Sequence, residues 1–101
     1  MGYVEVLKIS DLPEGSLRTI KVEDREVIVT RVGLNYYAFD DTCSHKKCSL
    51  GEGFLEGTTI ECPCHGAKFD IASGQVKALP ATEPIKTYPI RLEGDTIFIG
   101  V

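Results

Sequence analysis

Two short motifs distinguish this chain: Cys43-Ser44-His45 and, after residues 46–61, Cys62-Pro63-Cys64-His65. Written as metal ligands, they read C-x-H and then C-x-x-H, so each motif offers one thiolate and one imidazole. All four cysteines and both histidines of the chain lie between residues 43 and 65. Thiolate and imidazole groups are preferred ligands of zinc and of iron. This segment is therefore predicted to hold a metal centre.

Other uses of these residues fit the spacing less well. Common zinc sites place paired ligands about two to four residues apart, and Cys43-Ser44-His45 is tighter than most of them. A c-type haem requires C-x-x-C-H, whereas one residue separates Cys62 from Cys64. A framework of disulfides alone would leave both histidines unexplained. A structural zinc module is the alternative metal centre, and colour and iron content distinguish it.

The chain resembles the Rieske [2Fe–2S] proteins. The matching residues are the four ligands and the glycine after the second histidine: Cys43, His45, Cys62, His65 and Gly66. The resemblance to small soluble Rieske-type ferredoxins covers nearly the whole chain, with similar stretches at residues 11–15, 37–39, 78–81 and 88–90. It implies that the two cysteines bind the inner iron of one [2Fe–2S] cluster and that the two histidines bind the outer iron.

This ligand set has a direct consequence for redox behaviour. Because imidazole is neutral, a cluster with two thiolates is less negative than one with four and accepts an electron more easily. The family range is about −150 to +300 mV, compared with about −400 mV for plant-type ferredoxins. The resemblance implies an electron carrier rather than an enzyme. Its implied partners are a flavin-dependent NAD(P)H reductase and a terminal oxygenase or similar redox enzyme, both docking transiently.

Cys48 and Cys64 are two further cysteines close to the ligand positions. Respiratory Rieske proteins, which the chain resembles here, join a second cysteine of each loop as a disulfide. The resemblance therefore implies a Cys48–Cys64 bridge, which would add about 3 kcal/mol of stability in the chain-entropy model. Disulfides are unusual in the cytosol outside hyperthermophiles, so two thiols are the alternative. A thiol–disulfide switch at this pair would be a function of another class.

Two positions beside the second motif differ from the respiratory proteins. High-potential members carry Ser directly after the glycine of that motif and Tyr two residues later, and both hydroxyls donate hydrogen bonds to cluster sulfur. This chain has Ala67 and Phe69 there, which cannot donate. Since such bonds stabilise the reduced cluster, their absence predicts a potential low in the family range. Pro80 resembles the proline of the family's cluster-covering loop, with an ordinary loop proline as the alternative.

The remainder of the chain predicts an all-β fold, an antiparallel sandwich or barrel. Turn signals recur about every 8–12 residues, and no long stretch keeps a helical period. Near the C-terminus, Ile90 and Leu92 alternate with charged residues, and Gly94-Asp95 is a two-residue turn before the last strand. Strands are expected at residues 3–9, 16–22, 26–32, 36–39, 58–61, 67–70, 75–77, 90–93 and 97–101.

The chain is expected to form one domain, residues 1–101. Its base would come from residues 1–39 and 72–101, and a small cluster-binding part from about 40–71, where all the cysteines and histidines lie. This part reads as an insertion mounted on an ordinary β-scaffold.

Several other side chains of the cluster-binding part have structural interpretations. Asp40 and Asp41 are expected to form a turn rather than to act as catalytic acids. The apolar pair at residues 54–55, Phe54 and Leu55, is expected to pack at the base of the cluster loop. The basic pair at residues 46–47, Lys46 and Lys47, is either a docking rim for an acidic partner or a solvated surface pair.

Composition excludes several classes of protein. The 101 residues are 43% hydrophobic and 26% charged, which is typical of a globular chain rather than a disordered one. A net charge of −4 with only 11 basic residues argues against nucleic-acid binding. No apolar run approaches the roughly 18 residues of a membrane span, and the N-terminus lacks a secretory signal. A cytoplasmic monomer is expected; a Rieske subunit or excised fragment of a respiratory or oxygenase complex is the alternative.

Overall fold

The computed structural model describes residues 2–42, 48–64, 66–79 and 83–100. No helix among these residues is long and apolar enough to cross a membrane. Their secondary structure is almost entirely strand, with two short 3-10 helices, in the order β1 (Tyr3–Lys8), η1 (Ile9–Asp11), β2 (Leu17–Val22), β3 (Arg25–Val32), β4 (Asn35–Asp40), η2 (Leu50–Glu52), β5 (Phe54–Glu56), β6 (Thr59–Glu61), β7 (Lys68–Asp70), β8 (Val76–Ala78), β9 (Thr87–Tyr88), β10 (Ile90–Glu93) and β11 (Thr96–Gly100).

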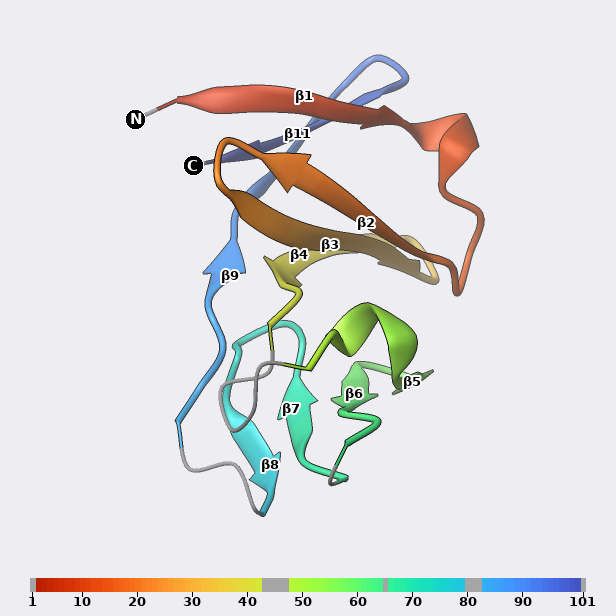
Figure 1. Cartoon of the computed structure of the whole chain (residues 1–101). Helices are drawn as coiled ribbons and strands as arrows, with labels where there is room; N and C mark the ends of the chain where they lie inside the picture. The colour runs from red at the N-terminus through yellow and green to blue at the C-terminus, as the bar shows by residue number, and fades with distance from the viewer. Residues whose placement is uncertain (1, 43–47, 65, 80–82, 101) are drawn as a thin grey trace.

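The described strands pair antiparallel in three sheets, whose strand orders are β1-β11-β10, β2-β3-β4-β9 and β5-β6-β7-β8. Figure 1 shows the second sheet between the other two, with both termini at the end formed by the first sheet. The predicted all-β antiparallel fold is confirmed. The third sheet extends through β8 to Ala78, past the expected limit of the cluster-binding part at residue 71.

Strand β3 is the centre of the hydrophobic core. Val27 and Val29 are fully buried in one cluster with Ile97 and Ile99 of β11, while Ile28 is fully buried in a second cluster. Because successive side chains of a strand point to opposite faces, the fully buried run at residues 27–30 of β3 needs a packed layer on each side. The consecutive run of Val and Ile in β3 thus explains the layered arrangement.

The cluster-binding segment leaves and re-enters the base through neighbouring strands. Strand β4 pairs with β9 at Ala38 with Tyr88 and at Phe39 with Thr87. The Asp40 N–H then donates to the Lys86 carbonyl at 2.9 Å. The chain between these strands therefore starts and ends at one edge of the middle sheet (Figure 1). This is the geometry of an insertion mounted on a scaffold.

A buried tyrosine connects β4 to β9 at the junction where the cluster-binding segment leaves and re-enters the base. The Tyr88 hydroxyl donates to an Asp40 carboxylate oxygen and accepts a 3.2 Å hydrogen bond from Arg25 Nη1. The Lys86 ammonium lies 5.1 Å from the centre of the Tyr88 ring. Burial raises the pKa of Tyr88, and donation to Asp40 raises it further. The side chain is thus held in its neutral, donating form, and it connects the last residue of β4 to the last residue of β9.

Gly74 provides the first test of the packing. It has a φ of +82°, and a Cβ there would lie 2.2 Å from the Ile85 carbonyl oxygen. We expect Gly74→Ala to lower the free energy of unfolding, measured in urea, by several kcal/mol, since a clash with backbone adds to the roughly 1–2 kcal/mol of left-handed strain. Gly15 is the matched control: its φ is also +82°, with no atom within 4 Å of its Cβ position. Equal losses in Gly74→Ala and Gly15→Ala would contradict the close approach to Ile85.

Tyr88→Phe tests the junction. Losing the hydroxyl should cost about 1–2 kcal/mol of unfolding free energy at neutral pH. A raised pKa in the folded state favours neutral tyrosine, so this contribution is complete below the ordinary tyrosine pKa of 10.0 and is lost as pH rises above it. The difference between wild type and Tyr88→Phe in urea unfolding should therefore be constant up to about pH 9 and shrink in more alkaline solution. A difference that grows above pH 10 would show that the hydroxyl is not held as a donor.

Candidate metal centre

Cys62 is the predicted ligand whose surroundings the structure describes. It directly follows β6, and it is 1% exposed. Its N–H donates to the Ala67 carbonyl at 2.7 Å, and its carbonyl accepts from the Gly66 N–H at 3.1 Å. These bonds continue the β6–β7 ladder beyond Glu61 and Lys68 and then close a tight turn. The β6–β7 tip, which begins at Cys62, thus lies at the end of the molecule remote from both termini (Figure 1).

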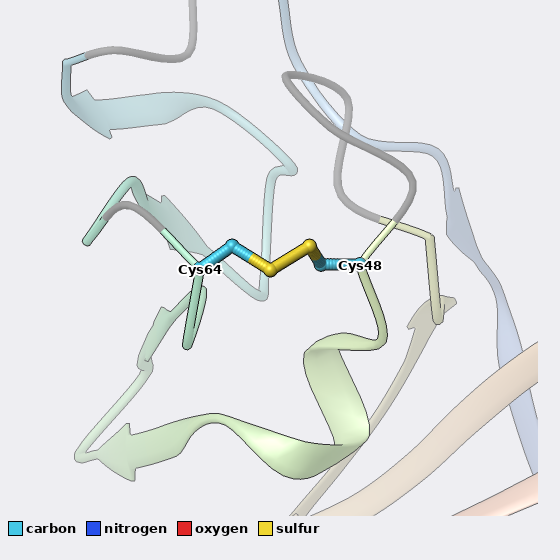
Figure 2. The surroundings of a disulfide bond; sticks show 2 residues. All are labelled: Cys48 and Cys64. Carbon is cyan, nitrogen blue, oxygen red and sulfur yellow. A yellow bond between two sulfur atoms is a disulfide. The ribbon is translucent and has the colours of Figure 1, made fainter.

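Cys48 and Cys64 form a disulfide, with their Cα atoms 6.5 Å apart. Figure 2 shows the bridge spanning from the segment before η2 to the β6–β7 tip. The implied pairing of these two cysteines is confirmed. The Cys62 sulfur and the two bridge sulfurs all lie within 4.8 Å of one another. The bridge therefore connects the two motif-bearing segments beside a predicted ligand atom.

Asp41 closes the base of the first loop. Its Oδ1 atom accepts from the Ser49 hydroxyl at 2.8 Å and from the Gly51 N–H at 2.9 Å. Its backbone carbonyl accepts from the Leu50 N–H at 2.6 Å, and Thr42 forms an isolated bridge with Ser49. The side-chain contacts of Asp41 reach eight and ten residues along the chain, so its role is structural but is not that of the expected local turn. Asp40 instead uses its side chain at the junction with Tyr88.

The side chains packed around Cys62 are apolar. Ala67 and Phe69 are fully buried in the same hydrophobic cluster as Cys62, with Ile60 and Leu50. Ala67 and Phe69 carry no polar side-chain atom, as their identity predicts. A soft thiolate at the edge of an apolar, water-excluding cluster suits an iron–sulfur centre. The described part of the site therefore fits the implied [2Fe–2S] group.

Other predicted site residues lie outside the described part of the chain. These are three of the four ligand candidates, the two lysines and the loop proline: Cys43, His45, His65, Lys46, Lys47 and Pro80. Their assignment as ligands, docking rim or shield stays a prediction.

The expectation for Phe54 is wrong. Its side chain is 67% exposed, whereas Leu55 packs against the hydrophobic cluster that includes Cys62. The two residues are neighbours in β5, and successive strand side chains point to opposite faces. Only one of the pair can therefore pack at the base of the loop, and β5 turns Leu55 inward.

A polar hollow of about 530 Å³ is lined in part by Cys48. Within the described residues its lining holds five carboxylates and one guanidinium: Asp24, Glu26, Asp40, Asp41, Glu52 and Arg25. The flank of the first loop is therefore negatively charged, in agreement with the acidic balance of the whole chain.

Comparisons with known proteins agree with this geometry. The family model of the Rieske [2Fe-2S] domain matches residues 2–89. The chain is 41% identical, over 103 residues, to the 3-phenylpropionate/cinnamic acid dioxygenase ferredoxin subunit of Escherichia coli strain K12, covering 100% of this chain and 95% of that protein.

Solved structures show the same similarity. The ferredoxin of carbazole 1,9a-dioxygenase from Nocardioides aromaticivorans IC177 has a TM-score of 0.93 and 32% identity, covering 98% of this chain and 97% of that one. A chain from the complex of reduced oxygenase and oxidized ferredoxin in carbazole 1,9a-dioxygenase has a TM-score of 0.90 and 34% identity, covering 96% of this chain and 91% of that chain.

These similarities confirm an electron carrier, rather than an enzyme, with a [2Fe–2S] cluster as its cofactor. By the match over residues 2–89, the chain belongs to the family of Rieske [2Fe–2S] domains.

Proposed function

We propose that this protein passes single electrons from a flavin-dependent NAD(P)H reductase to the terminal oxygenase of a dioxygenase system. The observation that carries the proposal is similarity over the full described fold to ferredoxins named as parts of such systems. One similar structure comes from a complex of ferredoxin with its oxygenase. The hairpin tip with buried Cys62, beside a second loop joined to it by a disulfide, supplies the matching site.

The proposed ligands are Cys43 and Cys62 for one iron and His45 and His65 for the other. When bound, the [2Fe–2S] group supplies reversible one-electron chemistry. Cys62 offers its thiolate from a backbone position fixed by hydrogen bonds to Ala67 and Gly66. The apolar side chains around it exclude water from the sulfur. Preorganisation of this kind limits the rearrangement that would accompany each electron transfer.

We infer that the potential lies in the low part of the Rieske range. Ala67 and Phe69 are fully buried in the hydrophobic cluster that contains Cys62, and their side chains carry no hydroxyl. The reduced, more negative state therefore gains no side-chain hydrogen bond from these two positions. A low potential suits a carrier that passes electrons onward to an oxygenase.

We place this activity in the cytoplasm and assign it to a monomer that docks transiently. NAD(P)H, the reductant of the proposed donor, is a cytoplasmic metabolite, so carrier and reductase meet there. A carrier must also release each partner after transfer, and this favours a small contact surface over a large apolar interface.

The proposal is tested by potentiometric titration of the purified holoprotein, followed by EPR at several pH values. We expect a rhombic Rieske signal with a midpoint in the lower half of the range of about −150 to +300 mV. We also expect this midpoint to be independent of pH near neutrality. A high midpoint that falls with pH near neutrality would indicate a respiratory-type protein. Zinc in place of iron would exclude electron transfer altogether.

Ala67→Ser tests the cause of the low potential. A hydroxyl at this position would donate to cluster sulfur and favour the reduced state, so we expect the midpoint to rise by about 50–100 mV. Ala38→Ser is the control, since Ala38 is also buried but belongs to the other hydrophobic cluster. An unchanged midpoint in Ala67→Ser, or an equal rise in Ala38→Ser, would contradict the explanation that a missing hydroxyl at position 67 lowers the potential.

The disulfide gives a further prediction. Its cysteines are 16 positions apart, and a loop of this length contributes about 3 kcal/mol to stability in the chain-entropy model. The double variant Cys48→Ser/Cys64→Ser should therefore unfold at lower denaturant concentration and release iron faster, followed by visible absorbance. Intact mass after thiol alkylation, without reductant, should show the bridge in the wild type.

Dithiothreitol serves as the control for this variant. It should destabilise the wild type as much as the double substitution does, and should not affect the double variant further. Equal stability of the wild type and the double variant would show that the disulfide does not stabilise the fold. Ready reduction of the bridge at cytosolic potentials would instead favour the thiol–disulfide switch, for which the exposed position of Cys64 is the supporting feature.

A further inference from the structure

Glu61 is the last residue of β6 and directly precedes the ligand candidate Cys62. Its side chain is half-buried and belongs to the outer face of the sheet, because the neighbouring Ile60 points into the core. A Cβ built on Gly66 would lie 3.6 Å from Glu61 Oε2. The carboxylate thus lies against the turn of the second motif, since Glu61 directly precedes the predicted ligand Cys62 and Gly66 directly follows the predicted ligand His65.

No cation among the residues that the structure describes forms an ion pair with this carboxylate. The ion pairs there join Lys8 to Asp95 and Arg91 to Glu93, both in the first sheet. Lys68 lies directly across the strand pair from Glu61, yet it forms no ion pair with it. Among the described residues no hydrogen bond reaches the Glu61 side chain either. Its charge is therefore neither ion-paired nor hydrogen-bonded within this part of the chain.

We propose that Glu61 is an electrostatic determinant of the reduction potential, which it lowers by placing an unpaired negative charge beside the second motif. The argument rests on the proposed function, because it assumes a cluster at that motif. An arriving electron makes the cluster more negative, and a nearby carboxylate repels it. Solvent screens a half-buried charge less than an exposed one. Glu61 thus acts together with the absent hydroxyls at Ala67 and Phe69, and by a different physical route.

The experiment is a redox titration of the holoprotein in a charge series at this position. Glu61→Gln removes the charge, and Glu61→Lys reverses it. We expect the ratio of reduced to oxidised protein at fixed solution potential to rise about threefold to tenfold in Glu61→Gln, tenfold being about 59 mV for one electron. This ratio should rise further in Glu61→Lys and should stay near the wild-type value in Glu61→Asp. High salt should reduce all of these differences.

Glu56→Gln is the matched control. Glu56 lies on the same face of the same sheet, but at the opposite end of β5, across from Thr59 and remote from the turn. The substitution Glu56→Gln removes the same charge as Glu61→Gln. A general effect of net charge would therefore shift the midpoint potential of both variants alike. We expect the midpoint of Glu56→Gln to equal that of the wild type.

The possible outcomes separate this inference from the function on which it rests. Midpoints that do not rise in the order Glu, Gln, Lys, or an equal shift in Glu56→Gln, would overturn the role of Glu61 and leave electron transfer intact. Absence of a Rieske EPR signal in the wild type would overturn the proposed function itself. If Glu61→Lys does not fold, the comparison of Glu61→Gln with Glu61→Asp still decides, because the two differ in charge.

Discussion

The antiparallel pairing of β4 with β9 is the constraint on which the site depends. It brings together the two points where the chain leaves the base and returns to it, through the Asp40–Lys86 hydrogen bond and the Tyr88 hydroxyl on Asp40. Residues more than forty positions apart are thereby fixed on one sheet edge. Holding the two ends together removes the closure part of the entropy cost of folding this segment. The third sheet then packs on the middle sheet through a shared hydrophobic cluster that includes Ile28 and Phe39.

From this junction outward, the site is held by three different kinds of contact. Hydrogen bonds that Asp41 accepts from residues 49–51 close the first loop. A covalent bridge then joins Cys48 to the hairpin tip. Apolar packing, finally, buries Cys62 in the same cluster as Ile28 of β3. These contacts act on different parts of the site, so weakening one leaves the others in place. The described residues that flank the two motifs are thus fixed by the fold itself.

The parts of this structure that were predictable from sequence depend on local patterns. Alternation and turn chemistry correctly placed most strands, including the Gly94-Asp95 turn between Glu93 and Thr96. Cys48 and Cys64 were paired through a family resemblance, and the bond is present. Phe54 was misplaced because a short apolar pair does not show which of its two members faces inward.

The features that sequence reasoning missed depend on contacts across the fold. The Glu61 carboxylate reaches the turn at Gly66 only because β6 and β7 pair in one particular register. The signal available beforehand was a lone acidic residue before a cysteine, which is common in unrelated sequences. In the same way, Tyr88 meets Asp40 across 48 positions, and no spacing rule predicts this contact. The hollow beside Cys48 also combines side chains from β3 and β4 with others from the first loop.

The potential of such a carrier is set by contributions of opposite sign. Neutral imidazole ligands raise it relative to a cluster held by four thiolates. Apolar residues at positions 67 and 69 and a carboxylate beside the turn act in the other direction. They do so by different means, since the first withholds a stabilising bond from the reduced state and the second adds repulsion. Hydrogen bonds act only over contact distance, whereas charge acts over several ångströms and is screened by salt. A chain with both features can therefore adjust its potential at the half-buried carboxylate without disturbing the buried packing around Cys62.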